Sequence, residues 1–136
     1  MQNIVKIKEV LDSISSLTSE YKQCQNIDHA GQLNKNMTSA KKQLLDTYTP
    51  EVSERFSNLD PKLHSLLKNH FTSLVLAIGD LQQLHTTKMS AQHIDPNVIH
   101  NLLLTHIHPI LRQIDSRLLA MHATLQGMSV VAKRNP

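Results

Sequence analysis

The chain has 136 residues, of which 40% are hydrophobic and only 3% aromatic. This composition suits one folded domain with an aliphatic core and excludes a wholly disordered chain. Three glycines and five prolines are too few for the many tight turns of a β-sandwich or barrel. The formal net charge is +3, but acidic and basic residues are interspersed, so the chain has no polybasic arm.

Cellular location is predicted from what the sequence lacks. The single cysteine, Cys24, excludes an internal disulfide. The N-terminal residues 1–13 lack the long apolar core of a signal peptide. The longest aliphatic run, residues 74–78, is far shorter than the ~20 residues that cross a bilayer. We therefore expect a cytoplasmic protein without a membrane span.

The first half of the chain predicts two long helices. Residues 3–25 place apolar side chains at steps of three and four, with Thr18 filling one gap. This apolar stripe consists of Ile4, Ile7, Leu11, Ile14 and Tyr21. A second helix is predicted over residues 29–48, with Asp28 as its N-cap. Its stripe consists of Ala30, Leu33, Met37, Ala40 and Leu44.

A short helix is predicted next, over residues 50–57. Thr49 can cap it, and Pro50 occupies a first-turn position where no backbone N–H is needed. Its Val52 and Phe56 are expected to plug one end of a helical bundle.

Asp60 and Pro61 repeat this start signal for a long helix over residues 61–88. The heptad stripe of this helix consists of Leu67, Phe71, Leu74, Ile78 and Leu81. Gly79 inside it costs about 1 kcal/mol relative to Ala, which we interpret as the mark of a tight helix crossing.

The last predicted helix covers residues 96–126, with Asp95 as its cap and Gly127 as its C-terminal glycine. Its stripe consists of Leu103, Ile107, Ile110, Ile114, Leu118, Met121 and Leu125. Pro109 removes the hydrogen bond to the Thr105 carbonyl, but the stripe keeps its phase across the proline. This favours one kinked helix over two helices joined by a loop. Residues 129–136 are expected to be frayed.

Together these elements predict an all-α fold in a single domain of residues 1–136. The predicted architecture is an antiparallel four-helix bundle with one short extra helix and a proline-kinked last helix.

Histidine is the compositional outlier. The nine histidines are His29, His64, His70, His85, His93, His100, His106, His108 and His122. A metal site on a helix needs ligands three or four residues apart, because only those converge on one ion. No such histidine pair and no Glu-x-x-His occurs on the predicted helices. We therefore expect no metal and no cofactor, and interpret the histidines as boundary residues. The alternative is a pH response between pH 5 and 7.

A histidine phosphotransfer domain is the best enzyme-like alternative. The stretch 63–69 resembles the His-x-x-Lys-Gly core of such domains, which implies His64 as phosphoacceptor. The sequence departs from that core because Lys68 comes one residue late and Asn69 replaces the glycine. No Gly-x-Ser-x-Gly motif or phosphate-cradling glycine loop occurs. The prediction is therefore that the protein is not an enzyme and has no catalytic residues.

Protein binding is the predicted function. The last helix is apolar on more than one face, and its candidate partner-binding residues are Leu102, Leu103, Leu104, Leu118 and Leu119. The stretch 42–45, Lys-Gln-Leu-Leu, resembles a helix segment of flagellar and type III export chaperones. We predict a non-enzymatic module, such as a secretion-type chaperone, adaptor or assembly subunit, that binds another protein through an amphipathic helix. A homodimer stays open.

A nucleic-acid-associated factor is the third alternative. Only a modest basic face supports it, formed by Lys22, Lys35, Lys41 and Lys42. The chain lacks a basic stripe and an aromatic stacking platform, so nucleic acid is not the expected partner.

Overall fold

The computed structural model describes residues 2–88 and 96–134. Within these two ranges every regular element is a helix and no strand occurs, which confirms the all-α prediction. The elements are α1 (Gln2–Lys22), α2 (Ile27–Thr47), α3 (Pro50–Leu59), α4 (Pro61–Lys88), α5 (Pro96–Leu102), the π-helical turn η1 (Leu103–Ile107) and α6 (His108–Arg134). The cap predicted at Asp95 lies outside the described residues.

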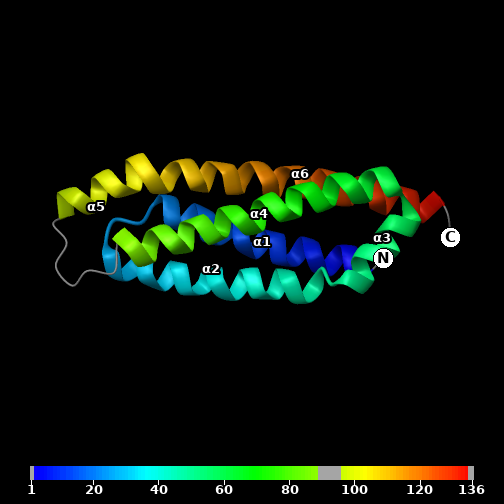
Figure 1. Cartoon of the computed structure of the whole chain (residues 1–136), viewed down its shortest axis with the longest axis horizontal. Helices are drawn as coiled ribbons and strands as arrows, with labels where there is room; N and C mark the ends of the chain where they lie inside the picture. The colour runs from blue at the N-terminus through cyan, green and yellow to red at the C-terminus, as the bar shows by residue number, and fades with distance from the viewer. Residues whose placement is uncertain (1, 89–95, 135–136) are drawn as a thin grey trace.

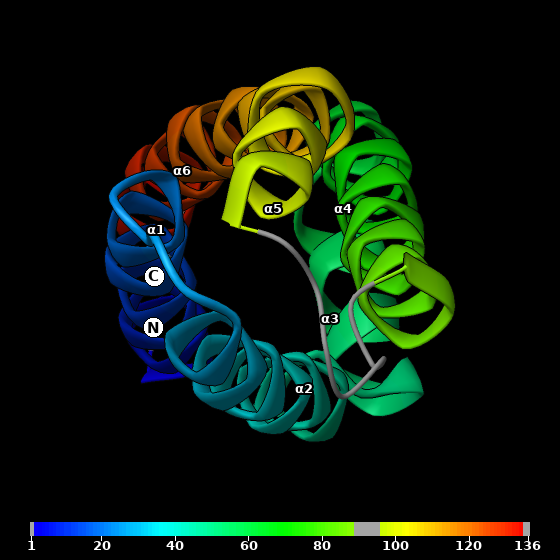
Figure 2. The same cartoon turned by 90° about the vertical axis from the view of Figure 1, so that its left-hand side faces the viewer.

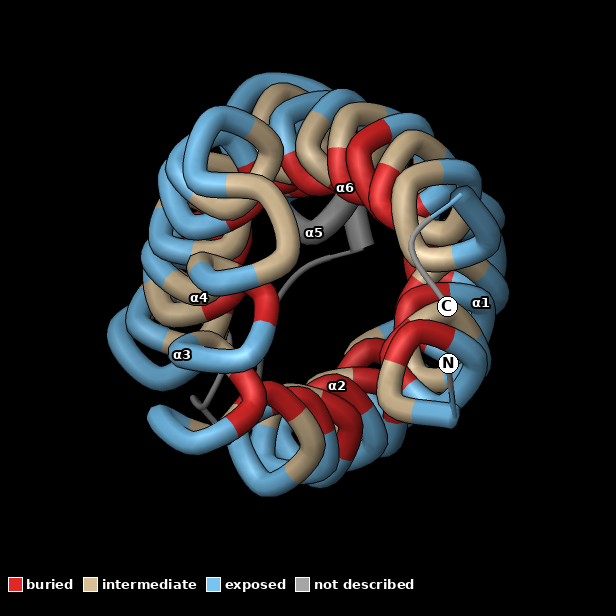
Figure 3. The backbone as a smooth tube through the Cα atoms, turned by 90° about the vertical axis from the view of Figure 1, so that its right-hand side faces the viewer, coloured by how far each residue is buried: buried red, intermediate tan, exposed pale blue. Residues whose placement is uncertain are grey.

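The long helices α1, α2 and α4 and the continuous run α5–η1–α6 lie along a common axis (Figure 1). The short α3 lies at the end of the bundle where the termini are. Viewed along the axis, they form a ring in the order α1, α2, α4, α6 (Figure 2). Buried residues face the inside of this ring and exposed residues face outward (Figure 3). The fold is thus a helical bundle with one central core.

The core confirms most of the predicted stripes. All five apolar residues of the first stripe and all five of the second are buried, and so is Thr18. Val52 and Phe56 are also buried, as expected for residues that plug one end of the bundle. Within each stripe, apolar residues recur every three or four positions. They therefore lie on one face of the helix, and this face packs in the core.

Two of the predicted caps are confirmed and one is wrong. Thr49 Oγ1 accepts a hydrogen bond from the Val52 N–H at 3.3 Å, and Asp60 Oδ1 accepts from the Leu63 N–H at 3.1 Å. At α2 the N-cap is Asn26 and not Asp28, because Asn26 Oδ1 accepts from the His29 N–H at 2.8 Å. The helix therefore begins two residues earlier than predicted.

The helix around Pro109 is continuous, as predicted, but the proline is accommodated by a π-turn. The His108 N–H bonds the carbonyl of Leu103, five residues back. This wider turn gives the proline ring room at the place where it would meet the preceding carbonyls. Beyond the proline, Ile114, Leu118, Met121 and Leu125 are all buried, so the stripe keeps its phase as predicted. Only one position differs from the prediction, because Leu111 is fully buried while Ile110 is half-buried.

The end of α6 also differs from the prediction. Gly127 does not terminate the helix, which continues to Arg134, so residues 129–134 are helical rather than frayed. Met128 is fully buried, and a Cβ on Gly127 would lie 3.4 Å from Leu63 Cδ1. Packing of these last turns against α3 and α4 outweighs the tendency of glycine to end a helix.

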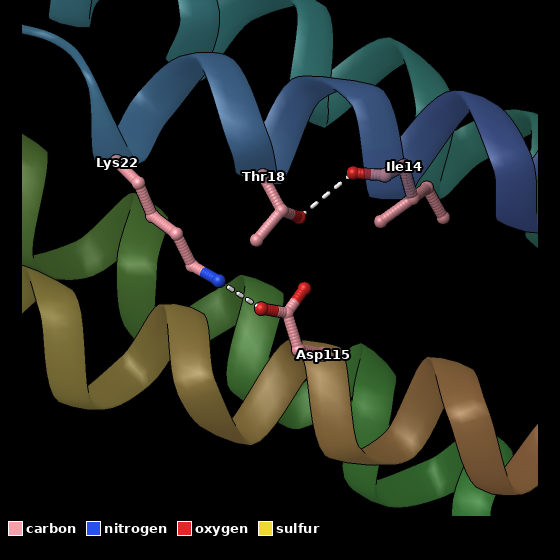
Figure 4. A network of polar contacts seen from close by, with 4 residues as sticks. All are labelled: Ile14, Thr18, Lys22 and Asp115. Atoms are coloured by element: carbon pink, nitrogen blue, oxygen red, sulfur yellow. Dashed lines mark hydrogen bonds and ion pairs between the residues drawn. The ribbon is translucent and has the colours of Figure 1, made fainter.

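Polar contacts join α1 to α6 along their length. The Lys22 ammonium pairs with the Asp115 carboxylate (Figure 4). The Lys8 ammonium donates to Gln126 Oε1 at 2.9 Å, and His122 Nε2 lies 3.2 Å from Asp12 Oδ1. The buried Thr18 hydroxyl donates to the Ile14 carbonyl of its own helix at 2.7 Å (Figure 4). Of the interfaces between neighbouring helices in the ring, that between α4 and α6 is the most extensive. The interface between α2 and α4 is the least extensive.

Candidate partner-binding site

The five leucines proposed from the sequence do not form one surface. Leu103 and Leu118 belong to the core, with exposed fractions of 5% and 3%, and Leu102 is half-buried against it. Leu104 and Leu119 are exposed, at 50% and 73%. They are fifteen positions apart, or about 22 Å at the helical rise of ~1.5 Å per residue. On the monomer these leucines therefore offer two separate exposed side chains rather than a face.

A pocket of about 420 Å³ lies where α2 ends, α3 begins and α4 passes both. We call it the anchor pocket, and it is lined by Leu45, Tyr48, Thr49, Pro50, Ser53, Lys68, Phe71 and Thr72. Its volume falls within the ~300–1,000 Å³ range of pockets that accept a ligand or a large side chain. The lining is mainly apolar, with Lys68 as its single charged residue.

The short connection between α2 and α3 creates this pocket. Because α2 ends at Thr47 and α3 begins at Pro50, the chain changes direction within two residues. Tyr48 lies at this corner, and its ring centroid is 4.7 Å from that of Phe71 and 5.9 Å from that of Phe56. These aromatic contacts form a firm apolar base. Leu45, one turn earlier on α2, remains 43% exposed beside it.

A hydrogen-bonded group lies on one side of the anchor pocket. The Tyr48 hydroxyl donates to Ser53 Oγ at 3.4 Å, and Ser53 Oγ lies 2.7 Å from Nε2 of the half-buried His64. Burial raises the pKa of Tyr48, and the hydrogen bond with Ser53 partly offsets that effect. The contact links α2, α3 and α4. For the phosphotransfer alternative, a phosphoryl donor could reach His64 Nε2 only after this nitrogen separated from Ser53.

The anchor pocket continues into a loosely packed face between two helices. We define the α2/α4 seam as Thr38, Lys41 and Leu45 of α2 together with Lys68, Thr72, Val75, Gly79 and Gln82 of α4. These residues follow one another at steps of three or four and so share one face of each helix. Polar contacts cross the seam, because Lys41 Nζ donates to Gln82 Oε1 at 3.1 Å and Gln82 Nε2 donates to Thr38 Oγ1.

Gly79 shows how open the seam is. A Cβ added to it would meet no heavy atom within 4 Å outside its own stretch of helix. The tight crossing predicted at this glycine is therefore wrong. Nor does a left-handed conformation explain the glycine, since no residue in the described ranges has a positive φ. What remains is a half-buried stretch of helix backbone with open space beside it, which another chain can approach closely.

Beyond the seam, towards the start of α2, the α2/α4 interface contains buried polar atoms. The ring of His85 lies against Gly31, where an added Cβ would be 3.8 Å from His85 Nε2. Both His85 Nδ1 and Asn34 Oδ1 are buried and have no hydrogen-bond partner in the described structure. Burial lowers the pKa of His85 because it disfavours the charged imidazolium. The His85 ring therefore lies in the least extensive interface of the ring.

Other kinds of site find no support among the described residues. No group of three or more His, Cys, Asp or Glu side chains there is arranged to hold a metal ion. His93 and the side chain of His100 lie outside the residues that can be described. Over the same ranges, every helix is too short or too polar to cross a membrane.

Comparison with known proteins gives no family for this chain. No family model matches it, and no curated protein or solved structure gave a match. The inferences below therefore rest on the chain's own residues and geometry.

Proposed function

We propose that the protein is a non-enzymatic helical module that binds a helix of another protein along the α2/α4 seam. One observation carries the proposal. The least packed interface in the ring lies next to an apolar pocket, with exposed Leu45 at their junction. A helix lying on the seam would bury Leu45 and insert one large apolar side chain into the anchor pocket. The classes of protein that this proposal covers are secretion-type chaperones, adaptors and assembly subunits.

A cytoplasmic location is part of the proposal. The free, buried thiol of Cys24 is compatible with a reducing compartment. Fractionation of the native cells, with antibody detection in each fraction, tests the location.

Site-specific photo-crosslinking in native cells tests the binding function. A crosslinking amino acid replaces Thr72, which is exposed and lines the anchor pocket. The matched control replaces Glu9, an exposed residue of α1. We expect a discrete adduct with another protein from position 72 and none from position 9. The adduct should disappear in a Leu45→Asp variant whose helicity is unchanged.

Two outcomes contradict the proposal. One is the absence of any adduct from position 72, and the other is an equal pattern of adducts from both positions. An adduct with twice the mass of the chain would show that the occupant is a second copy, and light scattering of the purified protein would then report a dimer.

A further inference from the structure

We infer that the helix bound by the α2/α4 seam is acidic, with carboxylates at its two ends and apolar or small side chains between them. This inference rests on the proposed function and specifies the chemistry of the partner. It follows from the charges on the seam, their spacing and the shape of the surface between them.

The seam contains positive charges only. Its ionisable residues are Lys41 on α2 and Lys68 on α4, and no aspartate or glutamate occurs among its members. Lys68 makes no hydrogen bond or ion pair with any described residue, and Lys41 bonds only the neutral Gln82. Neither ammonium is neutralised by a carboxylate of the described residues, so both are available to carboxylates of a partner.

The neighbouring carboxylates do not compete for these lysines. Asp80 lines the shallow pockets between α4 and α6, on the other side of α4. Asp46 is exposed on α2 and forms no ion pair with a described residue. Lys42 follows the half-buried Lys41 in the sequence and is exposed, so it adds further positive charge at the edge of the seam.

The spacing of the lysines predicts the spacing of the partner's carboxylates. Lys41 reaches Gln82, which is 82 − 68 = 14 residues along α4 from Lys68. This separation is about four helical turns, or ~21 Å. A partner helix that lies along α4 therefore needs acidic residues about fourteen positions apart.

The surface between the two lysines specifies the rest of the partner's face. Near Lys68, the anchor pocket accepts a large apolar side chain. Near Gln82, the bare backbone of Gly79 favours a small residue, because a small residue lets two helices approach closely. The same charges disfavour a second copy of this chain docked seam to seam, since that arrangement would bring lysines together.

Two synthetic helical peptides serve as probes. They share one apolar face with a leucine and an alanine at the predicted positions, and differ only in having two glutamates or two lysines fourteen positions apart. Fluorescence anisotropy measures their binding to the full chain at low and physiological salt. We expect the glutamate peptide to bind roughly tenfold more tightly at low salt, and the difference to shrink as salt is added.

Charge reversal in the protein tests the assignment to the seam. The double variant Lys41→Glu/Lys68→Glu should prefer the lysine peptide. Its matched control is Lys6→Glu/Lys133→Glu, which makes the same change in net charge at two exposed lysines outside the seam. Circular dichroism is used to check that both variants keep the helical content of the wild type.

Three results overturn the inference: no binding of the glutamate peptide, equal binding of both peptides, or reversal of preference in the control variant. These failures are distinct from failure of the proposed function. A protein crosslinked from position 72 would still show that the seam is occupied, in that case by a helix that is not acidic.

Discussion

Replacing Gly79 by alanine should stabilise the protein, although the change adds an atom inside a long helix. Alanine is favoured over glycine in a helix interior by ~0.8–1 kcal/mol. The new Cβ meets no heavy atom within 4 Å, so no steric cost offsets this gain. With an unfolding entropy of ~2.1 cal/mol/K per residue, a chain of 136 residues should show a Tm increase of about 3 °C.

Thermal unfolding followed by circular dichroism at 222 nm measures this change, with urea titration as a second readout. Gly127→Ala is the matched control in α6, where the added Cβ would lie 3.4 Å from Leu63 and the neighbouring leucine must yield slightly. We expect the control to gain less than Gly79→Ala. A Tm that stays constant or falls in Gly79→Ala would refute the conclusion that the seam is open at this position.

Three further predictions concern single side chains. Cys24 is 3% exposed and its burial raises the pKa of the thiol, so Ellman's reagent should modify the native protein at least ~10-fold more slowly than the urea-unfolded chain; equal rates would contradict this burial. Because burial holds the pKa of folded His85 below the 6.5 of the unfolded chain, stability should be lost as the pH falls below about 6.5. The Tm of His85→Gln should depend less on pH in that range than that of the wild type or of the exposed-site control His29→Gln. Ser53→Ala breaks the contacts with Tyr48 and His64 and should cost about 1 kcal/mol of unfolding free energy in a urea titration, whereas no loss would make those contacts incidental.

Most of the fold could be predicted because its determinants are local. The pairs Thr49-Pro50 and Asp60-Pro61 indicate where α3 and α4 begin. In the structure the side chains of Thr49 and Asp60 cap these helices as expected. The stripes of α1 and α2 follow from a period of three to four residues, which only a helix satisfies. The sequence does not single out Asn26 as the cap of α2, because Asn and Asp are equally good N-caps and both occur in the connection.

The candidate site could not be predicted in the same way. The openness of the α2/α4 seam depends on how two helices distant in sequence are spaced, and no periodicity within either helix reports that spacing. A glycine inside a helix, such as Gly79, fits a tight crossing and an open surface equally well. One feature of the sequence does point to the seam. The residues Lys41, Leu45, Lys68 and Thr72 lie outside the core stripes, on helix faces that an up-and-down bundle brings together.

Ile110 is the position of the last stripe at which the structure differs from the sequence prediction, and two alanine variants test this difference directly. The sequence places Ile110 in the core, whereas the structure places Leu111 there, fully buried, with Ile110 half-buried. Leu111→Ala should therefore cost about 3 kcal/mol, a Tm decrease of about 10 °C, because it leaves a cavity in the core.

Ile110→Ala should cost about 1 kcal/mol, since its side chain is only partly removed from water. Both variants are measured by thermal and urea unfolding beside the wild type. If Ile110→Ala were the more damaging of the two, Ile110 rather than Leu111 would be the core residue after Pro109, as the sequence predicted, and the packing described here would be wrong.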